Sequence, residues 1–397
     1  MDVGECIGAA IDRARRDGRT YSDKPPGMST LALPAAEAVR LPAPSRWTFE
    51  GDPRVWAVRV LVSGIAYLFL ALVLGRVSEG LAPGHGGEAV AAFALGTLVF
   101  PLAATTFGHV TAAVLGFGAF VLAWRGRSAL GGLAAGAAVT VEYQAAAILL
   151  VVGVYVAAAG LPPLTRYAAG ALPPLVLLGA YHWAAFGSPF HTSYRYVANE
   201  YAREQSSGLL GVHAPRAHGF HEVLTGDRGL LWSSPVLVAA AAGLVLLARR
   251  HHAEALVAGA VGLTFLAANC GYFLPYGGIS PGPRFLVPAL PFVALGLGPA
   301  LARWRVATLV LAGVSIVATT SLTLTWALAE NGYPGTVWRQ LARLPGDRES
   351  APLVDELAKN VLVWAGPNRL VAAAAVAACS AAALAVAVTG GSRRGAA

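Results

Sequence analysis

Long apolar runs alternate with short polar breaks along most of the chain. A helix needs about 20 apolar residues to cross the hydrocarbon core of a bilayer, and many of the runs approach this length. The pattern predicts an all-α, polytopic membrane protein with eleven spans. We place these spans at residues 56–76, 88–106, 109–124, 129–141, 143–160, 167–186, 229–248, 254–272, 284–301, 306–327 and 369–389.

The apolar run from 129 to 160 is too long for one span and carries Glu142 near its middle. We divide it into two short helices, because ten arginines then fall in short loops on one face, and the positive-inside rule assigns that face to the cytoplasm. With one helix the arginines after this point change sides and the bias disappears. The ten are Arg76, Arg125, Arg127, Arg166, Arg249, Arg250, Arg303, Arg305, Arg393 and Arg394.

The opposite, extracytoplasmic face then carries the long segments. Residues 1–55 form an extracytoplasmic segment with a juxtamembrane helix. Residues 56–327 form a transmembrane domain that contains a long extracytoplasmic loop at 187–228. A second loop at 328–368 precedes the last span and a cytoplasmic tail at 369–397. Long loops between spans usually carry function. We therefore expect a multi-pass protein of the plasma membrane whose active face is extracytoplasmic.

The composition supports a membrane protein. Apolar residues make up 56% of the chain and charged residues 13%, against roughly 25% charged in soluble proteins. The net charge of +8 comes from arginines scattered at the ends of apolar runs, which argues against nucleic-acid binding. The cysteines Cys6, Cys270 and Cys379 are too far apart for a metal or disulfide pattern, so we expect them to be packing residues.

The motif Ser22-Asp-Lys-Pro-Pro-Gly27 precedes an apolar stretch at 28–39 that is too short to span a bilayer. The two prolines restrict the backbone and set the direction in which the chain enters that stretch. Only two of the 29 basic residues are lysines, so Lys24 is unlike the generic cations of the chain. A lysine ammonium is a compact charge suited to a phosphate. The alternative is a snorkelling lysine beside a turn-forming aspartate.

Three further motifs follow in order along the chain: Phe107-Gly-His109, Val141-Glu-Tyr143 and Gly282-Pro-Arg-Phe-Leu-Val-Pro-Ala-Leu-Pro291. With the Asp-Lys-Pro-Pro motif before them, they give a sequence that resembles the C-type (GT-C) membrane glycosyltransferases. Within this fold the chain is most similar to the group of protein O-mannosyltransferases and lipid-A aminoarabinose transferases. The similarity covers about residues 20–330. The resemblance implies an all-helical GT-C-like fold.

The resemblance also implies a function. Enzymes of this kind transfer a monosaccharide from a polyprenyl-phosphate donor to an acceptor hydroxyl on the extracytoplasmic face, with inversion and without a nucleotide at the site. The acceptor would be a glycan, lipid or protein of the cell envelope. Lys24 matches the lysine that contacts the donor phosphate, and Arg284 would hold the same phosphate bidentately. The alternative for Arg284 is an anchor at the membrane interface.

Five further residues would contact the donor or the acceptor if the resemblance holds. Asp23, His109 and Glu142 would position and polarise the phosphate or the acceptor, directly or through a divalent metal that some relatives use. His109 stands where some relatives have an acid, and a histidine that only caps its span is the alternative. Tyr143 and Tyr194 would contact the donor, with an aromatic belt at the interface as the alternative for Tyr194.

Glu142 also stands out without the resemblance. The helix at 129–141 is about 20 Å long at 1.5 Å per residue and cannot cross a core of about 30 Å. The turn that follows it should therefore lie below the outer surface. An ionisable group at that depth is costly and usually functional. We expect Lys24 or Arg284 to be its partner.

The long loop at 187–228 contains His213, His218 and His221. Three histidines invite a zinc interpretation, but we find no acid or cysteine at a tight helical offset from them. We therefore expect a solvated loop that bears histidines and predict no metal-ligand set.

The N-terminal segment departs from the pattern of the family. In the resembling enzymes a first span and a loop with the proposed catalytic acid precede the Asp-Lys-Pro-Pro motif. Residues 1–21 are polar and contain no apolar run of that kind. We expect a chain whose start has been placed too late, so that the first span and the catalytic acid of the family are missing from it. The alternative is that Asp2, Asp12 or Asp17 takes that role.

Two other function classes remain open. A catalytically inactive relative would serve as a scaffold, and a transporter or flippase would move a lipid-linked sugar. Transporters usually show paired half-sites and polar groups near the bilayer midplane. Here the polar motifs gather at one face, which favours the transferase.

Overall fold

The computed structural model describes residues 12–38, 57–325 and 335–343, together with a few single positions beyond 373. The last predicted span, at 369–389, lies outside these ranges as a continuous element, as does most of the predicted loop at 328–368. Asp2, Cys6, Cys379, Arg393 and Arg394 also lie outside the described residues.

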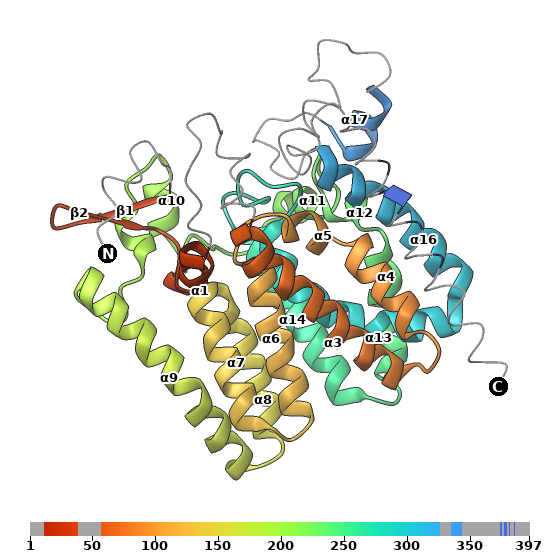
Figure 1. The fold of residues 1–397 in the computed structure, drawn as a ribbon, viewed down its shortest axis with the longest axis horizontal. Helices are drawn as coiled ribbons and strands as arrows, with labels where there is room; N and C mark the ends of the chain where they lie inside the picture. The colour runs from red at the N-terminus through yellow and green to blue at the C-terminus, as the bar shows by residue number, and fades with distance from the viewer. Residues whose placement is uncertain are drawn as a thin grey trace.

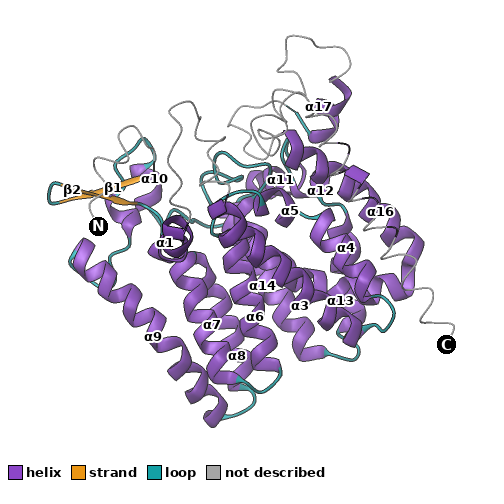
Figure 2. Ribbon diagram, viewed as in Figure 1, coloured by secondary structure: helices purple, strands orange, loops and turns teal. Residues whose placement is uncertain are grey.

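Helices make up most of the described chain, and one short hairpin supplies its strands (Figure 2). In chain order the elements are β1 (Arg13–Arg16), β2 (Arg19–Ser22), α1 (Pro26–Ala38), η2 (Val60–Gly64), α3 (Ile65–Leu81), α4 (Gly86–Gly96), α5 (Val99–Ala103), α6 (His109–Trp124), α7 (Ser128–Val141), η3 (Tyr143–Ala145), α8 (Ala146–Ala157), α9 (Leu161–Phe186), η4 (Ser193–Tyr196), α10 (Ala202–Ser206), α11 (Ala217–Thr225), α12 (Leu230–Ser233), α13 (Val236–Leu247), α14 (His252–Gly271), η5 (Arg284–Ala289), α15 (Leu290–Val293), η6 (Ala294–Gly296), α16 (Leu297–Thr325) and α17 (Val337–Arg343).

Several helices are long and apolar enough to cross a membrane. In the described chain there are four: Ala57–Leu81, Leu161–Phe186, His252–Gly271 and Arg284–Thr323. A fifth is added if the pair Ala217–Ser233 and Val236–Leu247, bent by 92°, counts as one span. The described residues are therefore mostly helical and contain four or five candidate membrane spans, and the predicted eleven spans are not confirmed.

The break predicted between the spans 284–301 and 306–327 coincides with a kink at Trp304, whose dihedral angles are non-helical within the apolar run Arg284–Thr323. One predicted span differs from the structure in where the chain bends. The predicted span 229–248 is broken between α12 and α13. Pro235 has no N–H and restricts the residue before it, and these constraints stop a continuous helix there.

The predicted break at Glu142 is confirmed. Helix α7 ends at Val141, Glu142 has extended dihedral angles (φ −143°, ψ 118°), and the chain re-enters a helix through η3 and α8. Close packing of α7 on α9 fixes the position of this break, because Gly132 and Gly136 have no side chain between the two backbones. A Cβ added at Gly136 would lie 2.7 Å from the carbonyl oxygen of Ala171 on α9.

The irregular elements gather at one end of the helices. The strands β1 and β2 and the short helices α1, α10 and α11 lie at that end, and the turns that join α6 to α7, α8 to α9 and α13 to α14 lie at the other (Figure 1). Four of the ten arginines predicted to face the cytoplasm lie in these turns: Arg125, Arg127, Arg249 and Arg250.

The predicted helix after the two prolines is confirmed as α1, and the segment before it is a β-hairpin that we did not predict. Asp17 and Gly18 have positive φ values (49° and 77°) and form the hairpin turn. The register pairs Arg13 with Ser22. Helix α1 rests on α7 at Gly27, where an added Cβ would lie 2.5 Å from the carbonyl oxygen of Thr140. The hairpin and α1 therefore hold the Asp-Lys pair beside the end of α7.

Candidate functional site

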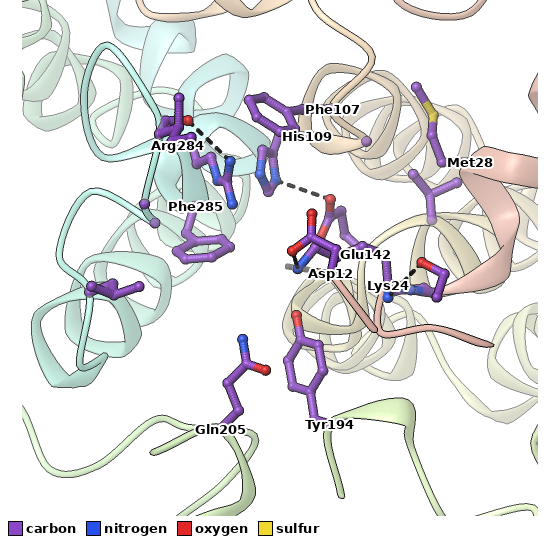
Figure 3. A pocket seen from close by; sticks show the side chains of 18 of the residues that line it. Asp12, Lys24, Met28, Phe107, His109, Glu142, Tyr194, Gln205, Arg284 and Phe285 are labelled. Atoms are coloured by element: carbon purple, nitrogen blue, oxygen red, sulfur yellow. Dashed lines mark hydrogen bonds and ion pairs between the residues drawn. The ribbon is translucent and has the colours of Figure 1, made fainter. Parts of the chain in front are cut away.

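Residues from all four sequence motifs line one cavity of about 470 Å³ at the end where the irregular elements gather (Figure 3). The segment from β2 into α1, the turn into α6 with its first residue, the end of α7 with its turn into η3, and the start of η5 each supply part of the wall. Their lining residues are Ser22, Lys24 and Pro25, Phe107, Gly108 and His109, Val141 and Glu142, and Arg284 and Phe285.

Lys24 is held between two carboxylates. Its Nζ lies 3.1 Å from Oδ1 of Asp12 and 3.2 Å from Oδ1 of Asp23. The Asp23 side chain is fully buried behind the lysine, whereas the Lys24 side chain is 38% exposed. Burial raises the pKa of Asp23, and the charge of Lys24 opposes this rise. Burial lowers the pKa of Lys24, but Asp23 and Asp12 outweigh it and raise the pKa above its usual value. Lys24 is therefore a permanent cation.

Glu142 contacts His109. Oε1 of Glu142 lies 3.2 Å from Nδ1 of His109, and the two side chains are 14% and 4% exposed. The edge of the imidazole ring also packs against Phe285 at a centroid distance of 5.3 Å. Gly108 leaves room for this pair, because a Cβ there would lie 2.9 Å from Oε1 of Glu142. The expected direct partner was Lys24 or Arg284, and the structure places His109 there instead.

The carboxyl group of Glu142 is a weaker acid than an ordinary glutamate. It lies in the turn between α7 and η3, outside both helices. Burial raises the pKa of Glu142 to about 7, although the charges of Arg284 and Lys24 act in the opposite direction. A carboxyl group with a pKa near neutrality can both accept and release a proton at physiological pH.

Arg284 presents its guanidinium to the cavity from the start of η5. The Cζ atom lies 4.2 Å from the ring centroid of Phe107, and Nη1 donates a hydrogen bond to the carbonyl oxygen of Ile279 at 3.4 Å. Within the described part of the chain, its Nε is buried and has no hydrogen-bond partner. Gly277 passes close to this group, since a Cβ there would lie 2.8 Å from Nε. The guanidinium therefore keeps donors available for an anion.

Two residues expected to contact the donor occupy different places. Tyr194 lines the cavity, and its ring meets the edge of Tyr143 at a centroid distance of 5.6 Å. Tyr143 is buried and is not among the lining residues. Its hydroxyl lies 3.0 Å from Nε2 of His182 and 3.2 Å from Oγ of Ser193. Tyr143 therefore does not line the cavity, where it was expected to contact the donor, and instead supports residues around it.

That support reaches the Asp-Lys pair. Ser193 donates a hydrogen bond of 2.6 Å to the carbonyl oxygen of Asp23. Asp23 was expected to touch the phosphate or the acceptor, but its fully buried side chain is not among the lining residues. Its carboxylate contacts Lys24 instead. A chain of contacts thus runs from Tyr143 through Ser193 and Asp23 to the lysine.

Asp12 was expected only as an alternative catalytic acid, and several other lining residues were not predicted at all. Asp12 reaches the cavity because the hairpin folds it back, and its carbonyl oxygen accepts a hydrogen bond from the backbone N–H of Asp23 at 3.4 Å. The Asp-Gly pair at the turn was the available signal for this hairpin. Tyr201, Gln205 and Tyr272 also line the wall. They come from the loop after α9 and the segment after α14, and the sequence pattern gave no signal for these three.

The described residues contain one group of side chains with the spacing of metal ligands, and it lies outside the cavity. Among the described residues, the group of three histidine or acidic side chains whose ligand atoms lie within 4.8 Å of one another is elsewhere, on α11. It consists of His218, His221 and Glu222. The expectation that no acid stands at a helical offset from these histidines was therefore wrong, because residues 217–225 form a helix and Glu222 is four positions after His218.

No known protein family, curated protein or solved structure matches the chain. The chemistry of the cavity therefore carries the functional argument. It combines two cations, Lys24 and Arg284, with a carboxylic acid of raised pKa and a wall of aromatic rings. Cations and aromatic rings together suit a ligand with an anionic group and a sugar-like or apolar face.

Proposed function

We propose that this protein transfers a monosaccharide from a polyprenyl-phosphate donor to an acceptor hydroxyl of the cell envelope, as a GT-C-like glycosyltransferase. One observation carries the proposal. Four motifs far apart in the sequence converge on a single cavity that holds two cations and two acids, and this cavity adjoins a large apolar groove.

The cations suit the phosphate of the donor. Lys24 supplies a compact charge, and Arg284 supplies a planar group with a free buried donor. As the glycosidic bond to the phosphate breaks, negative charge grows on the departing oxygen. Cations already fixed near that oxygen stabilise the transition state more than the ground state. Asp12 and Asp23 keep Lys24 in place through their contacts with Nζ.

The groove suits the lipid. A groove of about 1000 Å³ runs between α1, α3, α6, α7 and α9, and Val141 lines both the groove and the cavity. Most of its lining is aliphatic or aromatic, as at Leu31, Ile65 and Phe69. Pro26 and Gly27 line it directly after Lys24 and Pro25, which line the cavity. A polyprenyl chain in the groove would therefore bring its phosphate to Lys24.

Glu142 suits the role of the base. In the proposed step the acceptor oxygen attacks the anomeric carbon of the sugar, and the bond from this carbon to the phosphate oxygen breaks. The acceptor proton passes to Glu142, and the polyprenyl phosphate leaves as an anion. A single displacement of this kind inverts the anomeric configuration. The nearly buried carboxylate and its pKa near 7 favour this assignment. Asp12 is already paired with Lys24.

The test uses the full chain in proteoliposomes with a radiolabelled polyprenyl-phosphate sugar and acceptor extracted from the source membranes. The proposal expects label in the acceptor fraction, with strong losses for Lys24→Ala, Arg284→Ala and Glu142→Gln. Arg203→Ala is the matched control, because Arg203 is exposed and does not line the cavity. Equal transfer by all variants contradicts the site. Tight binding of the labelled lipid without transfer over a panel of sugars favours an inactive scaffold.

A further inference from the structure

We propose that helix α11 carries a zinc site formed by His218, His221 and Glu222, separate from the cavity described above. These residues stand at offsets of 0, 3 and 4 along one helix, and such offsets place side chains on one face. Imidazole and carboxylate donors are ligands that Zn²⁺ prefers. The inference rests on these side chains and does not depend on the proposed glycosyl transfer.

The distances fit an open site that closes around an ion. Oε1 of Glu222 lies 4.0 Å from Nε2 of His218 and 3.7 Å from Nδ1 of His221. Zn²⁺ held at about 2.0–2.2 Å from each ligand in a tetrahedral site requires ligand atoms roughly 3.3 Å apart. The side chains of His218 and His221 are 80% and 66% exposed. Small rotations of these free rings therefore complete the geometry.

The carboxylate is already oriented by a neighbour. Tyr276 donates a hydrogen bond of 2.7 Å to Oε2 of Glu222, which leaves Oε1 facing the two imidazoles. The ring of Tyr276 is itself covered by the guanidinium of Arg228, at 4.5 Å from its centroid. Hydrogen bonds that orient a ligand in this way are typical of metal sites and strengthen binding.

There is room beside the ligands for the ion and its waters. A hollow of about 440 Å³ is lined by His221, Glu222, the acid Asp227 and Arg339. Three protein ligands leave a fourth position open. A water molecule fits that position. Alkaline-earth ions prefer six or more oxygen ligands, so this set favours Zn²⁺ over Mg²⁺ or Ca²⁺.

The site is linked to the wall of the cavity through the same tyrosine. Nη1 of Arg228 donates hydrogen bonds to the carbonyl oxygens of Gly278 at 3.3 Å and Ser280 at 2.9 Å. Gly278 lines the cavity beside Arg284, which donates to Ile279 in the same segment. An ion that fixes Glu222 therefore also fixes Tyr276 and this wall.

The test measures metal binding by the full chain in detergent micelles after removal of metal by chelation. Titration with Zn²⁺ against a chromophoric competitor, and with Co²⁺ followed by its visible absorption, gives affinity and coordination. We expect one tightly bound Zn²⁺ per chain. His218→Ala and Glu222→Gln should each weaken binding by more than about 100-fold, and Tyr276→Phe by roughly 10-fold.

His213→Ala is the matched control, because His213 is another exposed histidine of the same loop that lies outside the trio. The His213→Ala variant should bind Zn²⁺ with the same affinity as the unmodified chain. Thermal unfolding without metal shows whether each variant folds. The proposal is overturned if Zn²⁺ does not bind at micromolar concentration. It is also overturned if His218→Ala and His213→Ala bind alike, or if Mg²⁺ competes with Zn²⁺ at similar concentration.

Discussion

Nδ1 of His109 lies 3.2 Å from Oε1 of Glu142, at the point where the start of α6 meets the end of α7. Both side chains are nearly buried, and the histidine is wedged against Phe285. Both residues line the cavity. Their contact joins two motifs that sequence reasoning had treated separately. Because of these surroundings, the ionisation of Glu142 should set the pH dependence of the proposed reaction.

We expect the rate of sugar transfer to rise as the pH increases through about 7. Burial raises the pKa of Glu142 to about 7, and only its ionised form accepts the acceptor proton. Below this pH the base is protonated and transfer falls. Glu142→Gln should lower the rate by about 100- to 10,000-fold, the usual range for a general base. The pH dependence of initial rates in proteoliposomes measures this limb.

Glu142→Asp is the control for charge, since it keeps a carboxylate but moves it back. A small residual rate with a similar pH limb is expected from it. The raised pKa of Glu142 also makes the free energy of unfolding depend on pH. The protonated group stabilises the fold fully below its ordinary pKa of 4.5, and this contribution is lost as the pH rises through about 7. A pH limb that persists unchanged in Glu142→Gln would assign the titration to another group.

The buried Asp23 makes the loss of Lys24 costly for stability as well as for activity. Lys24→Gln leaves a fully buried carboxylate with weaker compensation, and we expect a loss of about 1–3 kcal/mol in the free energy of unfolding. Replacing both partners, in Asp23→Asn with Lys24→Gln, should recover much of this loss, because neither side then retains an unpaired charge. Thermal and denaturant unfolding in micelles measures both variants.

The double variant separates folding from function. It should unfold close to the unmodified chain yet still fail to transfer sugar, because the cation is absent. If its stability loss equals the sum of the two single losses, Asp23 and Lys24 do not act as a pair.

Gly27 controls how closely α1 approaches α7. A Cβ at this position would lie 2.5 Å from the carbonyl oxygen of Thr140, and a backbone oxygen cannot move aside as a side chain can. We expect Gly27→Ala to displace α1 with Lys24 and to cost about 1–3 kcal/mol. Donor affinity should fall with it. Unfolding experiments and equilibrium binding of the labelled lipid measure the two effects.

Gly118→Ala is the matched control for this prediction. Gly118 lies inside α6, and an added Cβ there meets nothing within 4 Å. Alanine is favoured over glycine in a helix by roughly 0.5–1 kcal/mol, so this variant should be neutral or slightly more stable. Equal effects of the two substitutions would show that α1 tolerates a shift at Gly27.

The local parts of the site could be predicted from the sequence because their signals are local. Two prolines predict where α1 begins, and Glu142 in a run too long for one span predicts the break between α7 and α8. The number of spans could not be predicted in this way. Runs rich in alanine and glycine look continuous in the sequence, whereas the chain breaks at Pro235 and divides the predicted span 229–248 into α12 and α13.

The contacts between distant segments could not be predicted from the sequence pattern. Asp12 lies beside Lys24 only because the hairpin pairs Arg13 with Ser22, and these ten mostly polar residues give little hydrophobic alternation to reveal such a hairpin. The histidines of the long loop show their relation to Glu222 only once α11 is known to be a helix. In both cases tertiary structure decided the geometry.

Ser193 should act on the donor through the position of Lys24. Its hydroxyl donates to the carbonyl oxygen of Asp23 at 2.6 Å and lies 3.2 Å from the hydroxyl of Tyr143. Ser193→Ala removes this support and should cost about 1 kcal/mol of stability. Because the residue does not touch the cavity, the KM for the donor should rise several-fold while kcat changes less. Tyr143→Phe should shift KM in the same direction. Ser206→Ala, on the exposed surface of α10, is the control and should change neither constant. A loss confined to kcat in Ser193→Ala would instead place this hydroxyl in the chemical step.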